Sequence, residues 1–489
     1  MKTPNRKKNF SPAKSSYTKN SFSKNSYAKR NDYQNEDRFE PSAPRSETSS
    51  TMDIKPQHFN SFKPHEKIQS KNDFSFFATC GHYLEPLLVT EIKKFKIENC
   101  EQAYLGASFQ SNIEKALNLL LETRLSSGIY LKLHQEMIKT PHDLSSLAAS
   151  LPWNEILSPK LNYTIESVLS SIRFEDKQLF NSPLYTSQKF KDGINDFFKN
   201  KNIVPPKIDP KHHDFKLKLI ITGMNDVQNK IKGYEVGIFL DIANYNLGNR
   251  GNRPSQMRAP LRETLACALV RSMELKKDEI FLDGMCGSGT MGIEYLLEKM
   301  NLPAQYLNLM NEFYPYSFLK MPWFQKSDES KSAWKKIVTE KTKFIFNQLN
   351  YFQKNPINLV FNDISPKSIK DAKLTLQQSK LPCAPIFSQL DITQKSPQEF
   401  IRLIGKGEKS FLVFTNPPYG VRMEPDEVEK LEKLYFELGE NMKKQFKDSR
   451  FFIFSANMEM LKKVRLRPIK KLPFYNGALS AKFYEYPLH

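Results

Sequence analysis

One stretch constrains this chain more than any other: a short apolar run at 410–413, followed through Phe414 and Thr415 by Asn416-Pro417-Pro418-Tyr419. The run predicts a buried parallel strand, and the two prolines stiffen the turn after it, because each fixes its own φ and restricts the preceding residue. Such a turn holds two acceptors, the Asn416 side-chain oxygen and the Pro417 carbonyl, while Tyr419 offers a ring face. Acceptors and a ring suit a flat base with an exocyclic amine. Taken alone, the stretch is equally typical of a stiff strand-to-helix turn.

A glycine-rich loop lies upstream, after a predicted strand at 279–283 and before a predicted helix at 290–299. Its glycines let the backbone pass close to a ligand at the helix N-terminus. The loop matches neither the phosphate-loop pattern nor the full dinucleotide fingerprint, so a triphosphate or a dinucleotide is not favoured. The candidate ligand-binding residues are Asp283, Gly284, Cys286, Gly287, Ser288, Gly289 and Thr290.

Two further predicted strands, at 358–363 and 386–391, each end in an acid. Asp363 can accept both hydroxyls of a ribose, and Asp391 can accept an adenine amino group. Each acid alone is also a suitable helix cap. Their order after the glycine loop and before the Asn416 turn favours one shared ligand site, because ligands of doubly wound folds bind at the carboxyl ends of the strands.

The composition indicates which binding partners and which cellular compartment this protein is expected to have. The chain has 489 residues, which suggests two to four domains, and a net charge of +20, which favours a polyanion such as nucleic acid over a merely solvated basic surface or an anionic membrane. No apolar run approaches the roughly 18 residues of a membrane span. The five cysteines are far apart, which predicts a reduced, cytosolic protein without disulfides. No metal site is predicted, because the adjacent His212 and His213 would point to opposite faces of a strand.

Composition and periodicity also divide the chain. Residues 1–72 are rich in Lys, Asn and Ser and predict a disordered basic arm, which either touches phosphates or is an inert tail; a transit peptide is the least favoured alternative. Residues 73–139 predict a small α+β module, and 140–242 a second, lysine-rich one. The α/β part, 243–489, begins with Arg250 and Arg253, which suit an RNA phosphate, a cofactor carboxylate or paired domain-interface charges equally well.

The glycine loop and the Asn416–Tyr419 turn together resemble the S-adenosylmethionine-dependent amino-methyltransferases. From about residue 74 onward, the chain is similar to the bacterial 23S ribosomal RNA guanine-N2 methyltransferases that carry a THUMP domain. The segment 300–355 resembles an insertion of that family, and Gly284 stands where the family usually has proline, which we expect to loosen the loop. Further similar stretches lie at 77–79, 84–88, 109–110, 124–125, 241–263 and 475–479.

The resemblance implies a Rossmann-like methyltransferase domain at 243–489, preceded by a ferredoxin-like module at 73–139 and a THUMP RNA-binding domain at 140–242. It implies that Asp283 and the glycine loop hold the methionine part of S-adenosylmethionine, Asp363 its ribose and Asp391 its adenine. Asn416 and Pro417 would hydrogen-bond the target amine, in a turn stiffened by Pro418, and Tyr419 would stack on the base.

The implied activity is methyl transfer to the N2 amine of guanine in RNA, above all 23S ribosomal RNA, in the cytoplasm. Such an amine is a poor nucleophile, so acceptors at its hydrogens and correct alignment supply the catalysis. The target base must be unpaired or flipped. A transfer RNA guanine-N2 methyltransferase, a DNA adenine-N6 methyltransferase and a non-catalytic RNA-binding assembly factor remain alternatives, and the sequence leaves the oligomeric state open.

Overall fold

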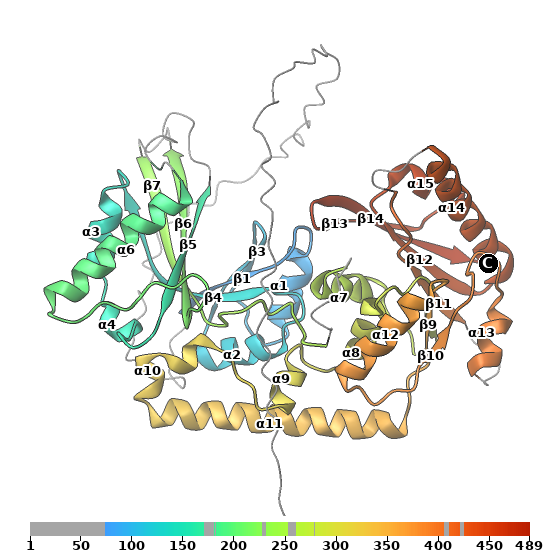
Figure 1. Cartoon of the computed structure of the whole chain (residues 1–489), viewed down its shortest axis with the longest axis horizontal. Coiled ribbons are helices and arrows are strands. Elements are labelled where there is room, and N and C mark those ends of the chain that lie inside the picture. The colour runs from blue at the N-terminus through green and yellow to red at the C-terminus, as the bar shows by residue number, and fades with distance from the viewer. Residues whose placement is uncertain are drawn as a thin grey trace, which may run out of the picture. The chain divides into compact units, whose positions relative to one another are not determined.

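The computed structural model describes residues 74–489, apart from 171–179, 181, 227–230, 253–260, 278, 405–409 and 421–424. The predicted basic arm and Arg253 lie outside the described residues. The described chain forms two seven-stranded sheets with helices packed on them (Figure 1).

The first sheet has the strand order β2-β3-β1-β4-β7-β6-β5 and is antiparallel except for the parallel pair β5 and β6. Its strands are β1 (Phe74–Thr79), β2 (Cys100–Ala103), β3 (Gly106–Ser111), β4 (Gly128–Ile138), β5 (Tyr163–Ser170), β6 (Phe215–Asp226) and β7 (Ile231–Asp241). Its helices are α1 (Glu85–Lys93), α2 (Ile113–Glu122), α3 (Asp143–Ser150), α4 (Trp153–Ile156) and α6 (Pro183–Asn200). Because β4 pairs with β7, the segments 73–139 and 140–242 share one sheet. Their assignment as ferredoxin-like and THUMP modules stays a prediction.

The second sheet has the order β10-β9-β8-β11-β12-β14-β13, with five parallel strands followed by an antiparallel hairpin. The strands are β8 (Ile280–Asp283), β9 (Leu359–Asn362), β10 (Ile386–Ser388), β11 (Phe411–Thr415), β12 (Ser449–Ser455), β13 (Lys470–Asn476) and β14 (Leu479–Leu488). The strand order reverses direction at the neighbours β8 and β11. In doubly wound folds this switch point is where ligands bind.

Helices cover both faces of the second sheet. Phe281 of β8 belongs to a core that includes Leu296 of α8, whereas its neighbour Leu282 belongs to a core with Leu431 of α14. Successive side chains of a strand point to opposite faces, so the domain has three layers. The helices of this domain are α7 (Glu263–Ser272), α8 (Thr290–Lys299), α12 (Pro366–Ser379), α13 (Pro397–Ile404), α14 (Pro425–Gln445) and α15 (Met458–Lys463).

The segment between α8 and β9 is helical and attaches to the first sheet. It contains α9 (Tyr306–Met310), η2 (Ser317–Lys320), α10 (Pro322–Gln325) and the long helix α11 (Asp328–Lys354) (Figure 1). Lys341 of α11 forms an ion pair with Glu122 of α2, and Lys320 Nζ lies 2.7 Å from Asp214 Oδ1. The predicted insertion therefore joins the two parts of the fold.

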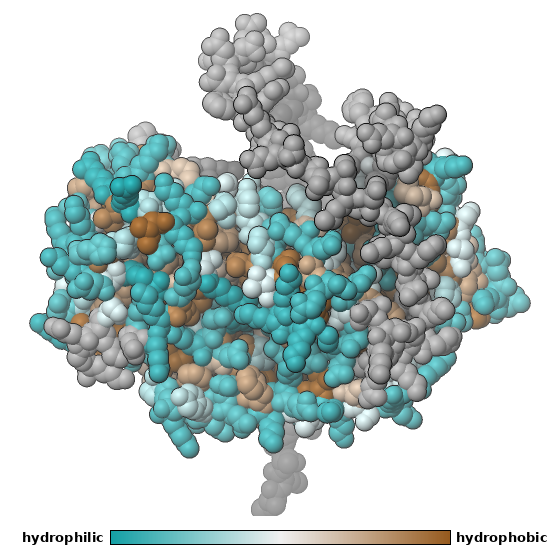
Figure 2. Space-filling view, turned by 180° about the vertical axis from the view of Figure 1, so that it is seen from behind, coloured by the Kyte–Doolittle hydropathy of each residue, from teal (hydrophilic) through white to brown (hydrophobic). Residues whose placement is uncertain are grey.

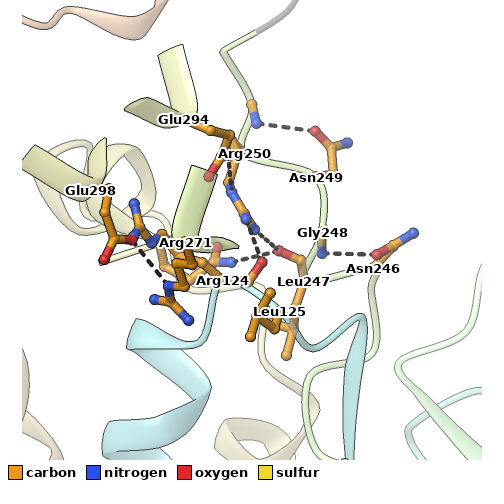
Figure 3. Close-up of polar contacts among 12 residues, drawn as sticks. Arg124, Leu125, Asn246, Leu247, Gly248, Asn249, Arg250, Arg271, Glu294 and Glu298 are labelled. Atoms are coloured by element: carbon orange, nitrogen blue, oxygen red, sulfur yellow. Dashed lines mark hydrogen bonds and ion pairs between the residues drawn. The ribbon is translucent and has the colours of Figure 1, made fainter. Parts of the chain in front are cut away.

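Arg250 connects the first sheet to the domain of the second sheet through buried polar contacts (Figure 3). It is 2% exposed, and its Nε lies 3.0 Å from Glu294 Oε1 of α8. Its Nη1 donates to the Leu247 carbonyl at 3.0 Å and its Nη2 to the Arg124 carbonyl at 2.7 Å. The sequence left three roles open for Arg250: binding an RNA phosphate, binding a cofactor carboxylate, or forming an ion pair at a domain interface. The structure shows the third, with Glu294 as the partner.

A second arginine extends this buried network. Arg271 of α7 contacts Glu91 Oε1 of α1 at 2.7 Å and Glu298 Oε2 of α8 at 3.0 Å. Burial works to raise the pKa of Glu91, but Arg271 and hydrogen bonds from Thr123 and Arg124 outweigh it, so the pKa lies below its usual value. The two parts of the fold are thus held together by fixed charges.

The surface is polar on the face seen in Figure 2, where apolar side chains are scattered among hydrophilic ones. Among the described residues, no helix is both long and apolar enough to cross a membrane. Within the same residues, no group of His, Cys, Asp and Glu side chains has the arrangement of a metal site.

Candidate active site

A cavity of about 720 Å³ lies at the carboxyl ends of the parallel strands, at the switch point of the second sheet. The predicted residues that line it come from four separate stretches of the chain. They are Asp283, Gly284, Cys286, Gly287, Ser288, Thr290, Asp363, Asp391, Asn416, Pro417, Pro418 and Tyr419. Of the predicted site residues, Gly289 alone is absent from the lining. The structure brings the others to one cavity, and their individual roles stay predictions.

The glycine loop after β8 turns with two left-handed residues, Gly287 at φ +51° and Gly289 at φ +80°. L side chains rarely adopt this conformation, so glycine is favoured at both positions. A Cβ at Gly289 would also lie 3.2 Å from side-chain atoms of Ala372 and Phe361. Gly289 is therefore the N-cap residue of α8 and lies outside the cavity lining. Gly287 and Ser288 line the cavity.

Gly284 ties the loop to the neighbouring strand. Its amide donates to the Phe414 carbonyl at 2.8 Å, and its φ is not left-handed. A Cβ there would approach the Thr415 side chain to 3.1 Å. Proline lacks the amide that makes this hydrogen bond. The glycine therefore does not loosen the loop at this point, contrary to the expectation from the sequence.

Asp283 is a buried carboxyl group that faces the cavity. It is 1% exposed, and neither carboxyl oxygen accepts a hydrogen bond of ordinary geometry from the described residues. Burial raises its pKa to about 8; the Gly292 amide opposes this shift, and the charge of Asp363 adds to it. A buried acid without a partner fits a ligand that brings an ammonium group, because the ammonium would compensate the charge of the carboxylate.

The other two predicted acids, Asp363 and Asp391, accept hydrogen bonds from turn residues and do not cap helices. Asp363 accepts from the Gly287 amide at 3.0 Å and the Ser365 amide at 2.9 Å, and Ser365 itself caps α12. Asp391 Oδ1 accepts from the amide and hydroxyl of Thr393 at 3.0 and 2.7 Å, and the next described helix starts only at Pro397. Neither acid is a helix N-cap, so that alternative is excluded. Asp363 also links the glycine loop to the end of β9.

The Asn416–Tyr419 turn is held from three neighbouring elements. The Tyr435 hydroxyl of α14 donates to the Pro418 carbonyl at 3.1 Å. Asn457, the cap of α15, donates to the Tyr419 carbonyl at 2.8 Å, and Asn476 of β13 donates to the Tyr419 hydroxyl at 3.3 Å. The turn is therefore rigid through side-chain contacts as well as through its prolines.

Within the turn, the Tyr419 hydroxyl donates to Asn416 Oδ1 at 2.7 Å. An amide oxygen has two lone pairs, so this acceptor can still receive a second donor. Burial raises the pKa of Tyr419 to about 12, with the Asn476 contact working against this shift. Tyr419 is therefore protonated near neutral pH and orients Asn416 instead of acting as a base. The sequence missed this contact because nothing in the motif shows how the turn closes.

Several lining residues could not be singled out from the sequence. Ile364 is 67% exposed directly after Asp363, which is unusual for a branched apolar residue and offers a surface for a flat ring. Asn476 reaches the cavity from the β13–β14 hairpin turn. One face of α14 also lines the cavity, and its i, i+3, i+4, i+7 spacing was the available signal. The residues on this face are Lys430, Lys433, Leu434 and Glu437.

The fold and the cavity together define an α/β protein that binds a nucleotide-like ligand at its switch point. Residues 250–485 match the model of the family described as RMKL-like, methyltransferase domain. The match confirms the resemblance inferred from the sequence, and the second sheet is an α/β methyltransferase fold. It also supports S-adenosylmethionine as the cofactor.

Individual relatives extend the comparison. The chain is 28% identical over 431 residues to a ribosomal RNA large subunit methyltransferase K/L from Hahella chejuensis, covering 86% of this chain and 54% of the relative. The solved structure of SMU.472, described as "a putative methyltransferase complexed with SAH", superposes with a TM-score of 0.68 at 20% identity, over 86% of this chain and 99% of the other. A predicted N6-adenine-specific DNA methylase from Listeria monocytogenes superposes with a TM-score of 0.66 at 20% identity, over 85% and 97%.

These likenesses differ in what they establish. The solved structures share the fold over most of both chains, and at this identity they establish the fold alone. The chain spans about half the length of the curated relatives that it matches. Its activity and substrate are therefore proposals that rest on the residues of the site.

Proposed function

We propose that this protein transfers a methyl group from S-adenosylmethionine to the N2 amine of a guanine in RNA, above all 23S ribosomal RNA. The observation that carries the proposal is the single cavity in which the unpartnered carboxyl of Asp283 and the Asn416–Tyr419 turn both lie. The Asp283 carboxyl suits a ligand with an ammonium group, and the Asn416–Tyr419 turn suits a base with an exocyclic amine.

The cofactor's parts have matching groups in the cavity. Asp283 would hold the amine of the methionine moiety, with the glycine loop passing close to the same end. Asp363 would accept from the ribose hydroxyls and Asp391 from the adenine amino group, with Ile364 against the ring. When bound, S-adenosylmethionine supplies a methyl group on a positively charged sulfur. Asp283 would then be ionised, because the ammonium offsets the desolvation that keeps it neutral.

The target amine would be held by two acceptors. The second lone pair of Asn416 Oδ1 and the Pro417 carbonyl would each accept one hydrogen of the amine. These bonds draw the nitrogen toward a tetrahedral geometry, which restores the lone pair that the ring otherwise delocalises. Tyr419 keeps Asn416 in place through its 2.7 Å hydrogen bond. Catalysis then rests on positioning, and no strong base is required.

RNA is favoured as the substrate for two reasons. The relative from Hahella chejuensis is named for ribosomal RNA, and the net charge of +20 suits a polyanion. We propose that residues 73–139 and 140–242, as ferredoxin-like and THUMP modules, present structured RNA to the cavity. A cytoplasmic location is part of the same proposal.

A DNA adenine-N6 methyltransferase is the second candidate. It is favoured by the structural likeness to the Listeria monocytogenes protein, and the Asn416–Tyr419 turn would suit adenine as well as guanine. A transfer RNA guanine-N2 methyltransferase would use the same cavity on another RNA.

The test is transfer of labelled methyl groups to separate fractions of ribosomal RNA, transfer RNA and double-stranded DNA. We expect label in ribosomal RNA, and loss of this label in the Asn416→Ala variant. Label confined to DNA or transfer RNA would favour the corresponding alternative. No label in any fraction, together with intact cofactor binding, would favour a non-catalytic RNA-binding factor.

A further inference from the structure

A second cavity, of about 880 Å³, lies where the first sheet meets the methyltransferase domain. One wall comes from the loop after β1 and the β2–β3 turn, and the other from the start of α7 and the β13–β14 turn. The aromatic residues in its lining are His82, Tyr104 and Tyr475. None of the roles proposed above uses this cavity.

Aromatic rings form a cluster beside this cavity. The rings of His82 and Tyr83 are 4.3 Å apart at 26°, and those of Tyr83 and Tyr475 are 5.8 Å apart at 11°. Tyr104 lies 6.0 Å from His82 and is 79% exposed. Tyr83 has φ +69°, which is uncommon for a bulky side chain, and it is 43% exposed. The exposed rings of Tyr83 and Tyr104 are available to stack on a flat ligand.

The second cavity adjoins the first through consecutive residues. Tyr475 lines the second cavity and Asn476 the first, where Asn476 also binds the Tyr419 hydroxyl. In the same way, Leu261 lines the first cavity and Arg262 the second. A strand that places one base against Tyr419 can therefore place a neighbouring base against Tyr475.

The polar groups of the lining suit a base better than a phosphate. Arg262 is followed by Glu263, so a phosphate there would meet a carboxylate. Asn246 and Asn249 carry amide groups, which can both donate to and accept from a base edge. Arg250 donates a hydrogen bond to the Leu247 carbonyl of this loop, and the Asn246 side chain accepts from the Gly248 amide at 2.8 Å (Figure 3). This wall is therefore preorganised.

We propose that the second cavity binds an unpaired nucleobase adjacent to the target guanine, by stacking on the exposed ring of Tyr104 and the half-buried ring of Tyr475, which line it, with Tyr83 packed against Tyr475. This inference rests on the proposed RNA methyltransferase function. Extruding a base for chemistry removes a stacking partner from its neighbour. An aromatic platform beside the reaction cavity replaces that partner and holds the strand while the target amine faces Asn416.

The test compares steady-state methylation of an unmodified 23S ribosomal RNA transcript by the full-length protein and its variants. Tyr104→Ala is the cleanest variant, because the side chain is almost wholly in solvent and its removal leaves the core unchanged. Tyr475→Ala is the second. Each has a matched phenylalanine variant that keeps the ring, and Tyr351→Ala, 58% exposed on α11, is the control for loss of an unrelated surface ring.

Loss of stacking predicts that each alanine variant raises KM for the RNA by roughly 5- to 100-fold. The phenylalanine variants and Tyr351→Ala should stay within about twofold of wild type, and the affinity for S-adenosylhomocysteine should not change. Ultraviolet cross-linking of the transcript should yield nucleotide adducts on peptides that contain residue 104 or 475.

Two outcomes would overturn the inference while leaving the proposed function intact. One is wild-type KM in both alanine variants of an enzyme that methylates the transcript. The other is a phenylalanine variant as impaired as its alanine counterpart, which would indicate a role of the hydroxyl instead of the ring. If the wild-type protein binds S-adenosylhomocysteine but methylates no RNA, the proposed function itself is wrong, and this inference fails with it.

Discussion

Asp283→Asn tests the most unusual group of the site, a buried carboxyl without a partner. The change removes the charge and keeps the shape. In the folded protein burial raises the pKa of Asp283 from 3.8 to about 8, so the folded state holds a proton that the unfolded state releases above pH 4. Stability falls with rising pH wherever the folded state binds more protons. Asp283 therefore destabilises the empty protein progressively between about pH 4 and pH 8.

The size of the effect follows from the shift. Four pH units at 1.36 kcal/mol each amount to roughly 5 kcal/mol at pH 8 and to roughly 1 to 2 kcal/mol at pH 5. The new amide also lacks a partner, which costs about 1–3 kcal/mol at either pH. We expect Asp283→Asn to be about 2 kcal/mol or more stable than wild type at pH 8, and equal to it or less stable at pH 5.

The assay is the unfolding transition of the methyltransferase domain at pH 5, 6.5 and 8, with and without S-adenosylhomocysteine. Asp328→Asn, which removes a carboxylate whose side chain is fully exposed, is the matched control for the loss of one negative charge. At 100 times its dissociation constant, the ligand should stabilise the wild-type protein by about 2.7 kcal/mol and the Asp283→Asn variant by far less.

Two results would refute this reasoning. An advantage of the variant that does not grow between pH 5 and pH 8 would show that Asp283 is not held neutral by burial. Equal stabilisation of both proteins by the ligand would show that Asp283 does not hold the ligand's amine.

Three further substitutions test other parts of the account. Asn416→Ala should abolish methyl transfer while calorimetry finds unchanged cofactor affinity; a matching loss of affinity would place Asn416 in the cofactor site instead. Asp363→Ala should weaken cofactor binding by tenfold or more, because it removes the ribose acceptor and the 3.0 Å contact to Gly287, and calorimetry at wild-type affinity would contradict this role. Arg250→Ala should lower the unfolding free energy by about 3–5 kcal/mol in urea titrations, since it leaves Glu294 buried and uncompensated, and a change below about 1 kcal/mol would show that the ion pair is dispensable.

The local elements of the methyltransferase half could be predicted because their signals are local. The helix predicted at 290–299 is α8, and Asn476-Gly477, a dipeptide typical of hairpin turns, joins β13 to β14, with Gly477 at φ +64°. The strand ends that carry Asp283, Asp363 and Asn416 follow from short apolar runs. Parallel strands then bring these ends to one edge of the sheet.

The remaining features depend on contacts between distant parts of the chain. Nothing near Arg250 shows that it is buried against Glu294, because a basic loop looks the same whether it meets RNA or an acid. The Asn416–Tyr419 hydrogen bond depends on the closure of the turn. The second cavity combines Tyr104 of the first sheet with Tyr475 of the last hairpin, which are 371 residues apart by their numbers. Such pairings come from tertiary structure, which periodicity and motifs do not describe.

The identity of the methylated nucleoside tests the central claim most directly. The full-length protein would be incubated with methyl-labelled S-adenosylmethionine and an unmodified 23S ribosomal RNA transcript, and the RNA would be digested to nucleosides and separated. We predict label in N2-methylguanosine for the wild-type protein and none for Asn416→Ala. Label in any other nucleoside, or equal label from the Asn416→Ala variant, would contradict the assignment of the Asn416–Tyr419 turn as the guanine amine site.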